Sequence, residues 1–253
     1  MAFDLSSISS ERANKGLRMV ICGSNKVGKS TFAAGAPSPV FIPTEDGLSG
    51  LPNLPAFPLA TDLSDHVYAA IGTLANESHP YQTAVFDSVD WMEPLVWNKT
   101  CRDHGWKSIE QPGYGKGYVE AAREWRQFLD GCDALITKGI NVILICHDQI
   151  KRIDLPTQDG YDAHVLKLHN RAAGLVLEWA DVCGFASHRI ATRKSDAGFG
   201  NTKTKAIGTG ERILRLESAP AHCAGNRFGL QDCPLTWADF SAALSAATTA
   251  KEA

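Results

Sequence analysis

The sequence of 253 residues predicts an α/β domain with a mainly parallel, twisted sheet covered by helices on both faces. Segments with strand and helix patterns alternate along the chain, as they do where crossover helices join parallel strands. Two expected strands, 17–22 and 141–146, are almost entirely apolar, which is typical of strands buried on both faces. The length favours a single domain, with a core of about residues 15–245, a short N-terminal extension and a frayed C-terminal tail.

The other elements follow from local patterns. The remaining strands are expected at 40–43, 83–86, 182–187 and 212–217, and the helices at 29–35, 63–77, 89–101, 119–137 and 170–180. Thr236 and Asp239 have the spacing of a capping box, which predicts a last helix that ends at Ala247. Three long glycine-bearing loops are expected at 103–117, 148–169 and 191–210. Loops of this length in an α/β domain are usually functional or disordered.

Residues 23–30 read Gly-Ser-Asn-Lys-Val-Gly-Lys-Ser, the pattern of a phosphate-binding P-loop, between an expected strand and an expected helix. Glycines let backbone N–H groups converge on phosphate oxygens, and the following helix points its positive dipole end at the same anion. Lys29 is expected to reach the β- and γ-phosphates of ATP, and Ser30 to ligate Mg²⁺. The alternative is a chance glycine turn before a helix. The residues expected to bind the nucleotide are Gly23, Ser24, Asn25, Lys26, Val27, Gly28, Lys29, Ser30 and Thr31.

Two acids at strand ends are candidates for the chemistry beside the phosphates. Asp87 ends an apolar strand, where a P-loop ATPase holds Mg²⁺, and Asp90 is the alternative. Glu45 ends the strand after the P-loop helix, where a carboxylate can orient or deprotonate the attacking water. Asp46 is adjacent and could take that role instead, and a turn-capping acid before Gly47 is a further interpretation.

Charge and composition limit the class of partner. The net charge of −3 argues against unspecific binding of nucleic acid. Residues 31–98 contain eight acids and no Lys or Arg, whereas residues 187–227 contain eight basic residues and three acids. This split indicates a local anion-facing surface, complementary faces on head-to-tail subunits, or an ordinary solvated face. The sequence has no membrane-spanning run and no signal-peptide pattern, and its seven cysteines lack a CxxC pair, so we expect a reducing, cytoplasmic compartment.

Two of the expected loops carry side chains suited to single-stranded DNA. Residues 113–118 interleave aromatic rings, which stack on bases, with glycines and a lysine, which neutralises phosphate. The residues expected to contact DNA are Tyr114, Lys116 and Tyr118 in this segment, and Lys151 and Arg152 at the start of the second loop. The alternatives are a flexible entry to a helix and basic residues of an ordinary loop end.

Taken in order, several segments resemble the RecA family. FIPTE resembles the strand that carries the catalytic glutamate, and VFDSVDWM resembles the Walker B segment. VILICHDQIKR resembles the strand whose terminal polar residue, here Gln149 with His147 and Asp148 nearby, senses the γ-phosphate. GYGKGYVEAAREW lies where the first DNA-binding loop of the family enters a helix. AGNRFGL resembles the late segment that sends a basic residue, here Arg227, into the ATP site of the neighbouring subunit.

The chain looks most like phage-encoded, core-only RecA-like ATPases of the AAA type, grouped with single-strand annealing and recombination proteins. This resemblance implies a hydrolase that uses ATP and Mg²⁺, binds single-stranded DNA and works in the bacterial host cytoplasm. It implies catalytic roles for Glu45, Lys29, Arg227 and Gln149. It also implies a homo-oligomer, either filament or ring, with the ATP site between subunits, and a single-strand-binding protein as a candidate partner. The alternatives are a helicase-like or terminase-like motor, a nucleotide-gated loader with slow hydrolysis, and a small-molecule kinase.

Overall fold

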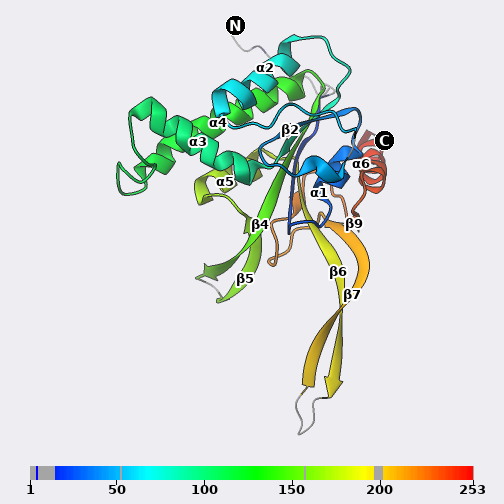
Figure 1. Ribbon diagram of the computed structural model, residues 1–253. Coiled ribbons are helices and arrows are strands. Elements are labelled where there is room, and N and C mark those ends of the chain that lie inside the picture. The colour runs from blue at the N-terminus through cyan, green and yellow to red at the C-terminus, as the bar shows by residue number, and fades with distance from the viewer. Residues whose placement is uncertain (1–3, 5–14, 52, 157, 197–201, 253) are drawn as a thin grey trace.

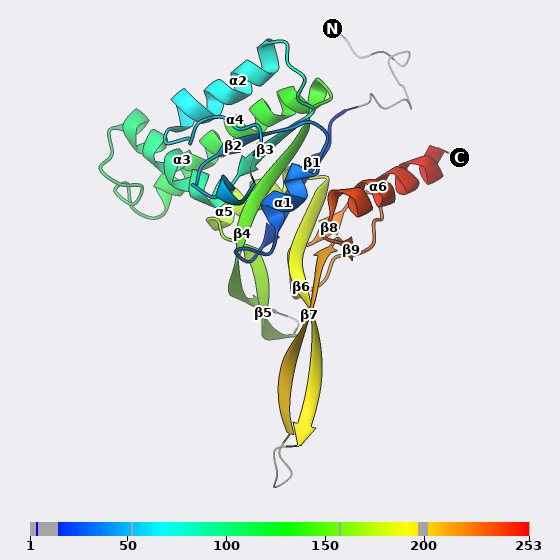
Figure 2. The same cartoon turned by 45° about the vertical axis from the view of Figure 1, so that its right-hand side comes forward.

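The computed structural model describes residues 4, 15–51, 53–156, 158–196 and 202–252 (Figures 1 and 2). The strands are β1 Arg18–Gly23, β2 Pro39–Pro43, β3 Thr83–Asp87, β4 Asn141–Leu155, β5 Gln158–Leu166, β6 Val182–Asp196, β7 Thr202–Arg215, β8 Gly225–Asn226 and β9 Cys233–Pro234. The helices are α1 Lys29–Ala34, a 3₁₀ turn η2 Leu48–Gly50, a π-helical segment η3 Leu63–Tyr68, α2 Ala69–Asn76, α3 Val89–His104, α4 Lys116–Thr137, α5 Asn170–Trp179 and α6 Trp237–Glu252. In this part of the chain, no helix is long and apolar enough to cross a membrane.

The sheet has the strand order β2-β3-β4-β1-β6-β7-β9, with β5 paired to β4 and β8 paired to β6. The first five strands in that order are parallel to one another, and β7 is antiparallel to β6. β1 lies between β4 and β6, and all of its residues after Arg18 are buried. The predicted α/β class, with a mainly parallel sheet, is confirmed.

Helices cover both faces of the sheet and enclose a separate core on each. One core joins the sheet to α2, α3, α4 and α5, with Trp125 and Phe128 of α4 among its largest buried side chains. The other joins the opposite face to α1 and α6, where the Phe32 ring lies 5.5 Å from Trp237 and 5.8 Å from Phe240. Both views show these two layers, with α1 and α6 on the side away from α3 and α4 (Figures 1 and 2).

Two segments that the sequence predicted as loops are β-hairpins, so that prediction was wrong. β4 continues beyond Cys146 to Leu155 and returns as β5, and β6 and β7 pair from Phe185–Arg215 out to Asp196–Thr202. The β6–β7 arm extends well away from the body of the molecule (Figures 1 and 2). Antiparallel strands satisfy each other's N–H and C=O groups, so polar residues can form a ribbon without an apolar face to reveal it.

The third expected loop is shorter than predicted. α3 continues to His104 and is followed by Gly105, whose φ of 66° suits a helix C-terminus. α4 begins at Lys116, earlier than expected, so only residues 105–115 separate the two helices. At the start of α6, the backbone N–H of Asp239 donates to Thr236 Oγ1 at 3.1 Å, and α6 continues past Ala247 into the segment where fraying was expected.

Candidate nucleotide-binding site

The P-loop lies at the carboxyl edge of the parallel strands. The strand register pairs Gly23 of β1 with His147 of β4, and Pro43 of β2 with Asp87 of β3. Four neighbouring strands therefore deliver their following residues to the same edge. In open α/β sheets, this edge is where ligands bind.

Two glycines give the P-loop its shape. Gly28 has a φ of 109°, and a Cβ there would lie 2.4 Å from Nη1 of Arg212. At Gly23, with a φ of 155°, a Cβ would lie 2.3 Å from the carbonyl oxygen of Ala186. At Gly28 the positive φ would strain any other residue, and at Gly23 a side chain would collide with a backbone carbonyl, so the motif requires glycine at both.

Lys29 lies inside the loop with only 5% of its surface exposed. Its ammonium donates hydrogen bonds to the carbonyl oxygens of Gly23 at 2.7 Å and Ser24 at 3.0 Å. Burial lowers the pKa of Lys29, although the nearby Asp87 carboxylate acts in the opposite direction. A phosphate group beside this ammonium would offset the cost of burying its charge. The loop therefore fits the phosphates of a nucleotide.

Ser30 and Asp87 meet next to the loop. Ser30 Oγ donates to Asp87 Oδ2 at 2.7 Å, although the two residues are 57 positions apart. Burial raises the pKa of the Asp87 carboxyl, whereas the hydrogen bond from Ser30 lowers it. Mg²⁺ prefers oxygen ligands of this kind, and its charge would stabilise the buried carboxylate. The pair brought together by the fold therefore fits Mg²⁺.

Glu45 lies beside the end of β3. The N–H of Thr44 donates to the carbonyl oxygen of Asp87 at 2.8 Å, which fixes the chain just before Glu45. Ser88 Oγ then donates to Glu45 Oε1 at 2.7 Å. Asp46, the alternative from the sequence, is exposed. Glu45 is therefore hydrogen-bonded to the residue that directly follows Asp87, which places it next to the Ser30–Asp87 pair.

His147 is a site residue that the sequence named only as a neighbour of Gln149. The ring Nδ1 of His147 lies 3.0 Å from Asp90 Oδ2, and the backbone N–H of His147 donates to Asp90 Oδ1 at 3.0 Å. Burial raises the pKa of Asp90, but the bonds and charge of His147 outweigh this effect and lower it. Its role could have been predicted from its position, because His147 is the first polar residue after the apolar run of β4. Asp90, the alternative magnesium ligand, is hydrogen-bonded to His147 in the middle of β4.

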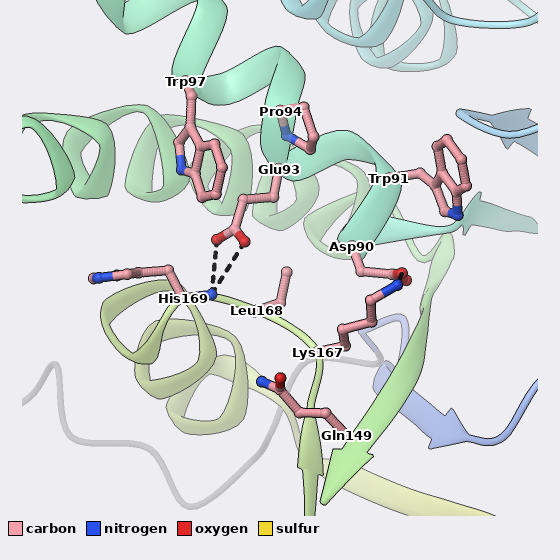
Figure 3. A pocket seen from close by; sticks show the side chains of 9 residues that line it. All are labelled: Asp90, Trp91, Glu93, Pro94, Trp97, Gln149, Lys167, Leu168 and His169. Carbon is pink, nitrogen blue, oxygen red and sulfur yellow. Dashed lines mark hydrogen bonds and ion pairs between the residues drawn. The ribbon is translucent and has the colours of Figure 1, made fainter. Parts of the chain in front are cut away.

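Gln149 lies two residues further along β4 and lines a separate pocket (Figure 3). Its Nε2 donates to the carbonyl oxygen of Leu166 at 3.2 Å. The structure therefore places His147 closer than Gln149 to the candidate catalytic carboxylates, since His147 Nδ1 is 4.0 Å from Glu45 Oε1.

Arg227 lies at the opposite edge of the sheet from its own P-loop. Its guanidinium donates to Asp181 Oδ1 at 2.9 Å and to the carbonyl oxygen of Glu178 at 2.9 Å. The preceding Asn226 pairs with Val182, which pairs with Met19 at the start of β1. The length of β1, roughly 16 Å at about 3.3 Å per residue, separates that edge from the loop.

Arg212 of β7 approaches the P-loop from a distant part of the chain. Its Nη1 donates to the carbonyl oxygen of Val27 at 3.4 Å, across 185 positions. Its place beside the P-loop could not be predicted from the sequence, because Arg212 is one of eight basic residues between 187 and 227 and no neighbouring residue distinguishes it.

The candidate DNA residues near α4 differ in their surroundings. The side chain of Tyr114 is fully exposed, and that of Lys116 is exposed. Tyr118 instead stacks on His169, with ring centroids 4.0 Å apart and an interplanar angle of 8°, and its hydroxyl donates to Glu110. Tyr114 is therefore available to stack on a base, whereas the ring of Tyr118 already has a partner.

The other two candidates lie on the exposed part of β4. Lys151 Nζ donates to Asn170 Oδ1 at 2.7 Å, at the start of α5. Arg152 Nε lies 3.3 Å from Asp154 Oδ1 on the same strand. Both cations face solvent on the β4–β5 hairpin, where the pairings are weak and exchangeable.

The fold and this edge of the sheet define the class of protein, a P-loop nucleotide-binding domain of the α/β type. The chain belongs to the AAA domain family, whose family model matches residues 15–228. It is similar in structure to the RadB recombinase, with 15% identity, 86% of this chain and 84% of that chain covered, and a TM-score of 0.46. It is also similar to the flagellar accessory protein FlaH from Methanocaldococcus jannaschii, with 11% identity, coverages of 80% and 85%, and a TM-score of 0.38. No curated protein matches the sequence.

Proposed function

We propose that the chain is an ATPase that binds single-stranded DNA and acts in phage-type recombination or strand annealing. The observation that carries the ATPase proposal is the convergence of Lys29, the Ser30–Asp87 pair and Glu45 at one edge of the sheet. A phosphate-binding cation, magnesium ligands and a carboxylate for the water are the parts that ATP hydrolysis needs.

Each residue has a defined task in this proposal. Lys29 binds the β- and γ-phosphates, and Ser30 and Asp87 hold Mg²⁺. Mg²⁺, when bound, neutralises negative charge that develops on the phosphate oxygens. Glu45, oriented by Ser88, takes the proton of the attacking water or orients that water.

Head-to-tail assembly is supported by the position of Arg227. It lies at the edge of the sheet opposite its own P-loop, where a following subunit could present its ATP site. An arginine supplied in trans is a recurrent device in P-loop enzymes. We propose a homo-oligomer with the ATP site between subunits.

Single-stranded DNA binding is supported by exposed aromatic and basic side chains. Tyr114, Lys116 and Lys151 are all exposed. Local positive charge of this kind can bind phosphates although the whole chain is acidic.

The test is ATP hydrolysis by the full chain with Mg²⁺, with and without a dT oligonucleotide. We expect hydrolysis that the oligonucleotide accelerates, and background turnover for Lys29→Ala with an unchanged circular dichroism spectrum. Wild-type turnover in the folded variant would refute the ATP site, and failure of the oligonucleotide to bind would refute the DNA proposal alone. Annealing of complementary strands, without opening of a duplex, separates this function from that of a helicase-like motor.

A further inference from the structure

A pocket of about 470 Å³ lies between α3, β4 and the segment that leads into α5, which we name the α3 pocket (Figure 3). Its volume falls within the range of roughly 300–1,000 Å³ that is typical of ligand sites. It is distinct from the P-loop, but Asp90, which binds His147, contributes to its lining. The pocket is therefore a neighbour of the nucleotide site.

The α3 pocket has aromatic walls held in place by packing. Trp91, near the start of α3, is 53% exposed. Trp97, further along α3, packs edge-on against Tyr118, with ring centroids 5.6 Å apart, and Tyr118 stacks on His169. The rings of Trp97 and His169 are thus held in place by packing against Tyr118, while about half of the Trp91 side chain is exposed to solvent.

Polar groups lie deeper in the same pocket. Glu93 is only 6% exposed, and its carboxyl oxygens accept hydrogen bonds from the N–H of His169 at 3.0 and 3.1 Å (Figure 3). Burial raises the pKa of Glu93 to about 7, so the carboxyl is partly protonated near neutral pH. A carboxyl in this state can donate as well as accept a hydrogen bond, as the edge of a nucleobase requires.

The exposed ammonium of Lys167 lies at the pocket. The Lys167 side chain is 57% exposed, and its Nζ lies 3.8 Å from Asp90 Oδ2, too far for a hydrogen bond. Burial is the main cause of the lowered pKa of His169, and the positive charges of Arg171 and Lys151 act in the same direction. Lys167 thus adds an exposed positive charge to an aromatic pocket, in a chain whose net charge is −3.

We propose that the α3 pocket receives one unstacked base of single-stranded DNA, which stacks on Trp91 while Lys167 contacts the adjoining phosphate. This inference rests on the proposed function, because it names a base-binding site for that DNA. A flat apolar group followed by an anion matches aromatic walls beside the exposed ammonium of Lys167, whereas an apolar side chain of a second protomer would make no use of that ammonium.

The experiment measures the affinity of the full chain, with a non-hydrolysable ATP analogue, for a labelled dT oligonucleotide and for an abasic oligomer of the same length. The variants are Trp91→Ala, Trp91→Phe and, as a matched control, Trp106→Ala, whose ring stacks on His104 outside the pocket. Trp91→Ala should weaken dT binding by roughly 5-fold to 150-fold, the range expected for one stacked base, and leave abasic binding unchanged. Trp91→Phe should recover most of the loss, and Trp106→Ala should bind like the wild type.

Different failures have different meanings. If the wild type binds dT and Trp91→Ala binds it equally well, the pocket inference fails and the proposed function stands. Equal losses for dT and for the abasic oligomer also overturn the base pocket. A wild type that binds neither oligomer refutes the proposed function and this inference with it. A change in the sedimentation of Trp91→Ala without DNA, at unchanged dT affinity, would identify a second protomer as the occupant and overturn the proposal.

Discussion

His147 Nδ1 lies 3.0 Å from Asp90 Oδ2 on α3, and the same nitrogen lies 4.0 Å from Glu45 Oε1. His147, in the middle of β4, is thereby connected to an acid in the first turn of α3 and to the candidate base. β4 is the strand between β1 and β3, so this imidazole lies between the strands that carry the P-loop and Asp87. Any movement of Asp90 would change the position of His147 beside Glu45.

Asp90→Asn is therefore expected to lower ATP turnover by up to about 10²-fold, the effect of a misplacement of about 1 Å, with a much smaller change in nucleotide affinity. Steady-state kinetics and fluorescent-nucleotide titration measure the two effects. Asp65→Asn, an exposed acid of η3, is the matched control and should behave like the wild type. If Asp90→Asn binds nucleotide poorly but hydrolyses the bound nucleotide at the normal rate, Asp90 does not act through His147.

Glu45→Gln should keep nucleotide binding and lose hydrolysis by about 10²-fold to 10⁴-fold, because an amide can still accept the hydrogen bond from Ser88 but cannot take a proton from water. Asp46→Asn is the control, since Asp46 is exposed. Single-turnover hydrolysis with a separate binding measurement decides between them. If Asp46→Asn is inactive and Glu45→Gln is active, the catalytic acid is the second of the pair.

The sequence predicted what depends on local pattern and burial, and it failed where distant segments meet. β1 and the first part of β4 were predictable because strands buried on both faces must be apolar, and the P-loop because its glycines serve backbone conformation. The β4–β5 and β6–β7 hairpins carry no such signal, since pairing rather than burial satisfies their backbone. The contact of Arg212 with Val27 spans 185 residues, and no local pattern encodes it.

Arg212→Ala should weaken ATP binding by about 2-fold to 5-fold, the scale of an exposed charge interaction worth up to about 1 kcal/mol. The loss should shrink at high salt, because salt screens an exposed charge. Arg123→Ala on α4, whose side chain is 73% exposed, removes the same charge far from the loop and serves as the control. Equal losses in the two variants would indicate a general charge effect and no special role for Arg212.

Glu93 should make stability depend on pH. Its folded pKa is raised, by burial, from 4.5 to about 7, so the unfolded chain releases the proton first as the pH rises. The contribution of Glu93 to the free energy of unfolding is therefore greatest below pH 4.5, falls between pH 4.5 and about 7, and does not change at higher pH. The total loss is up to about 3 kcal/mol at 1.36 kcal/mol per pKa unit.

Glu93→Gln removes this titration and should be more stable than the wild type at pH 8, with a difference that disappears toward pH 4.5. Urea unfolding at a series of pH values measures the free energy of unfolding of both proteins. Glu77→Gln replaces an exposed glutamate and should follow the wild-type profile. Parallel profiles for Glu93→Gln and the wild type would show that Glu93 titrates normally.

The last prediction concerns Arg227 and the assembly. Arg227→Ala should leave nucleotide binding intact but slow hydrolysis in the oligomer, by roughly 10³-fold or more if it acts as an arginine finger. The same residue also pairs with Asp181 inside its own protomer, at 2.9 Å. Asp181→Asn is therefore the necessary control, because it breaks the ion pair and keeps the arginine.

Mixed oligomers separate the two roles. A Glu45→Gln subunit still carries Arg227, and an Arg227→Ala subunit still carries Glu45, so an interface between them in the correct order holds one complete site. ATP turnover should rise when the two inactive variants are mixed, and it should pass through a maximum near equal proportions. An ion pair within one protomer cannot be restored by a neighbour. Absence of any recovery, together with slow hydrolysis by Asp181→Asn alone, would assign Arg227 to the stability of its own subunit.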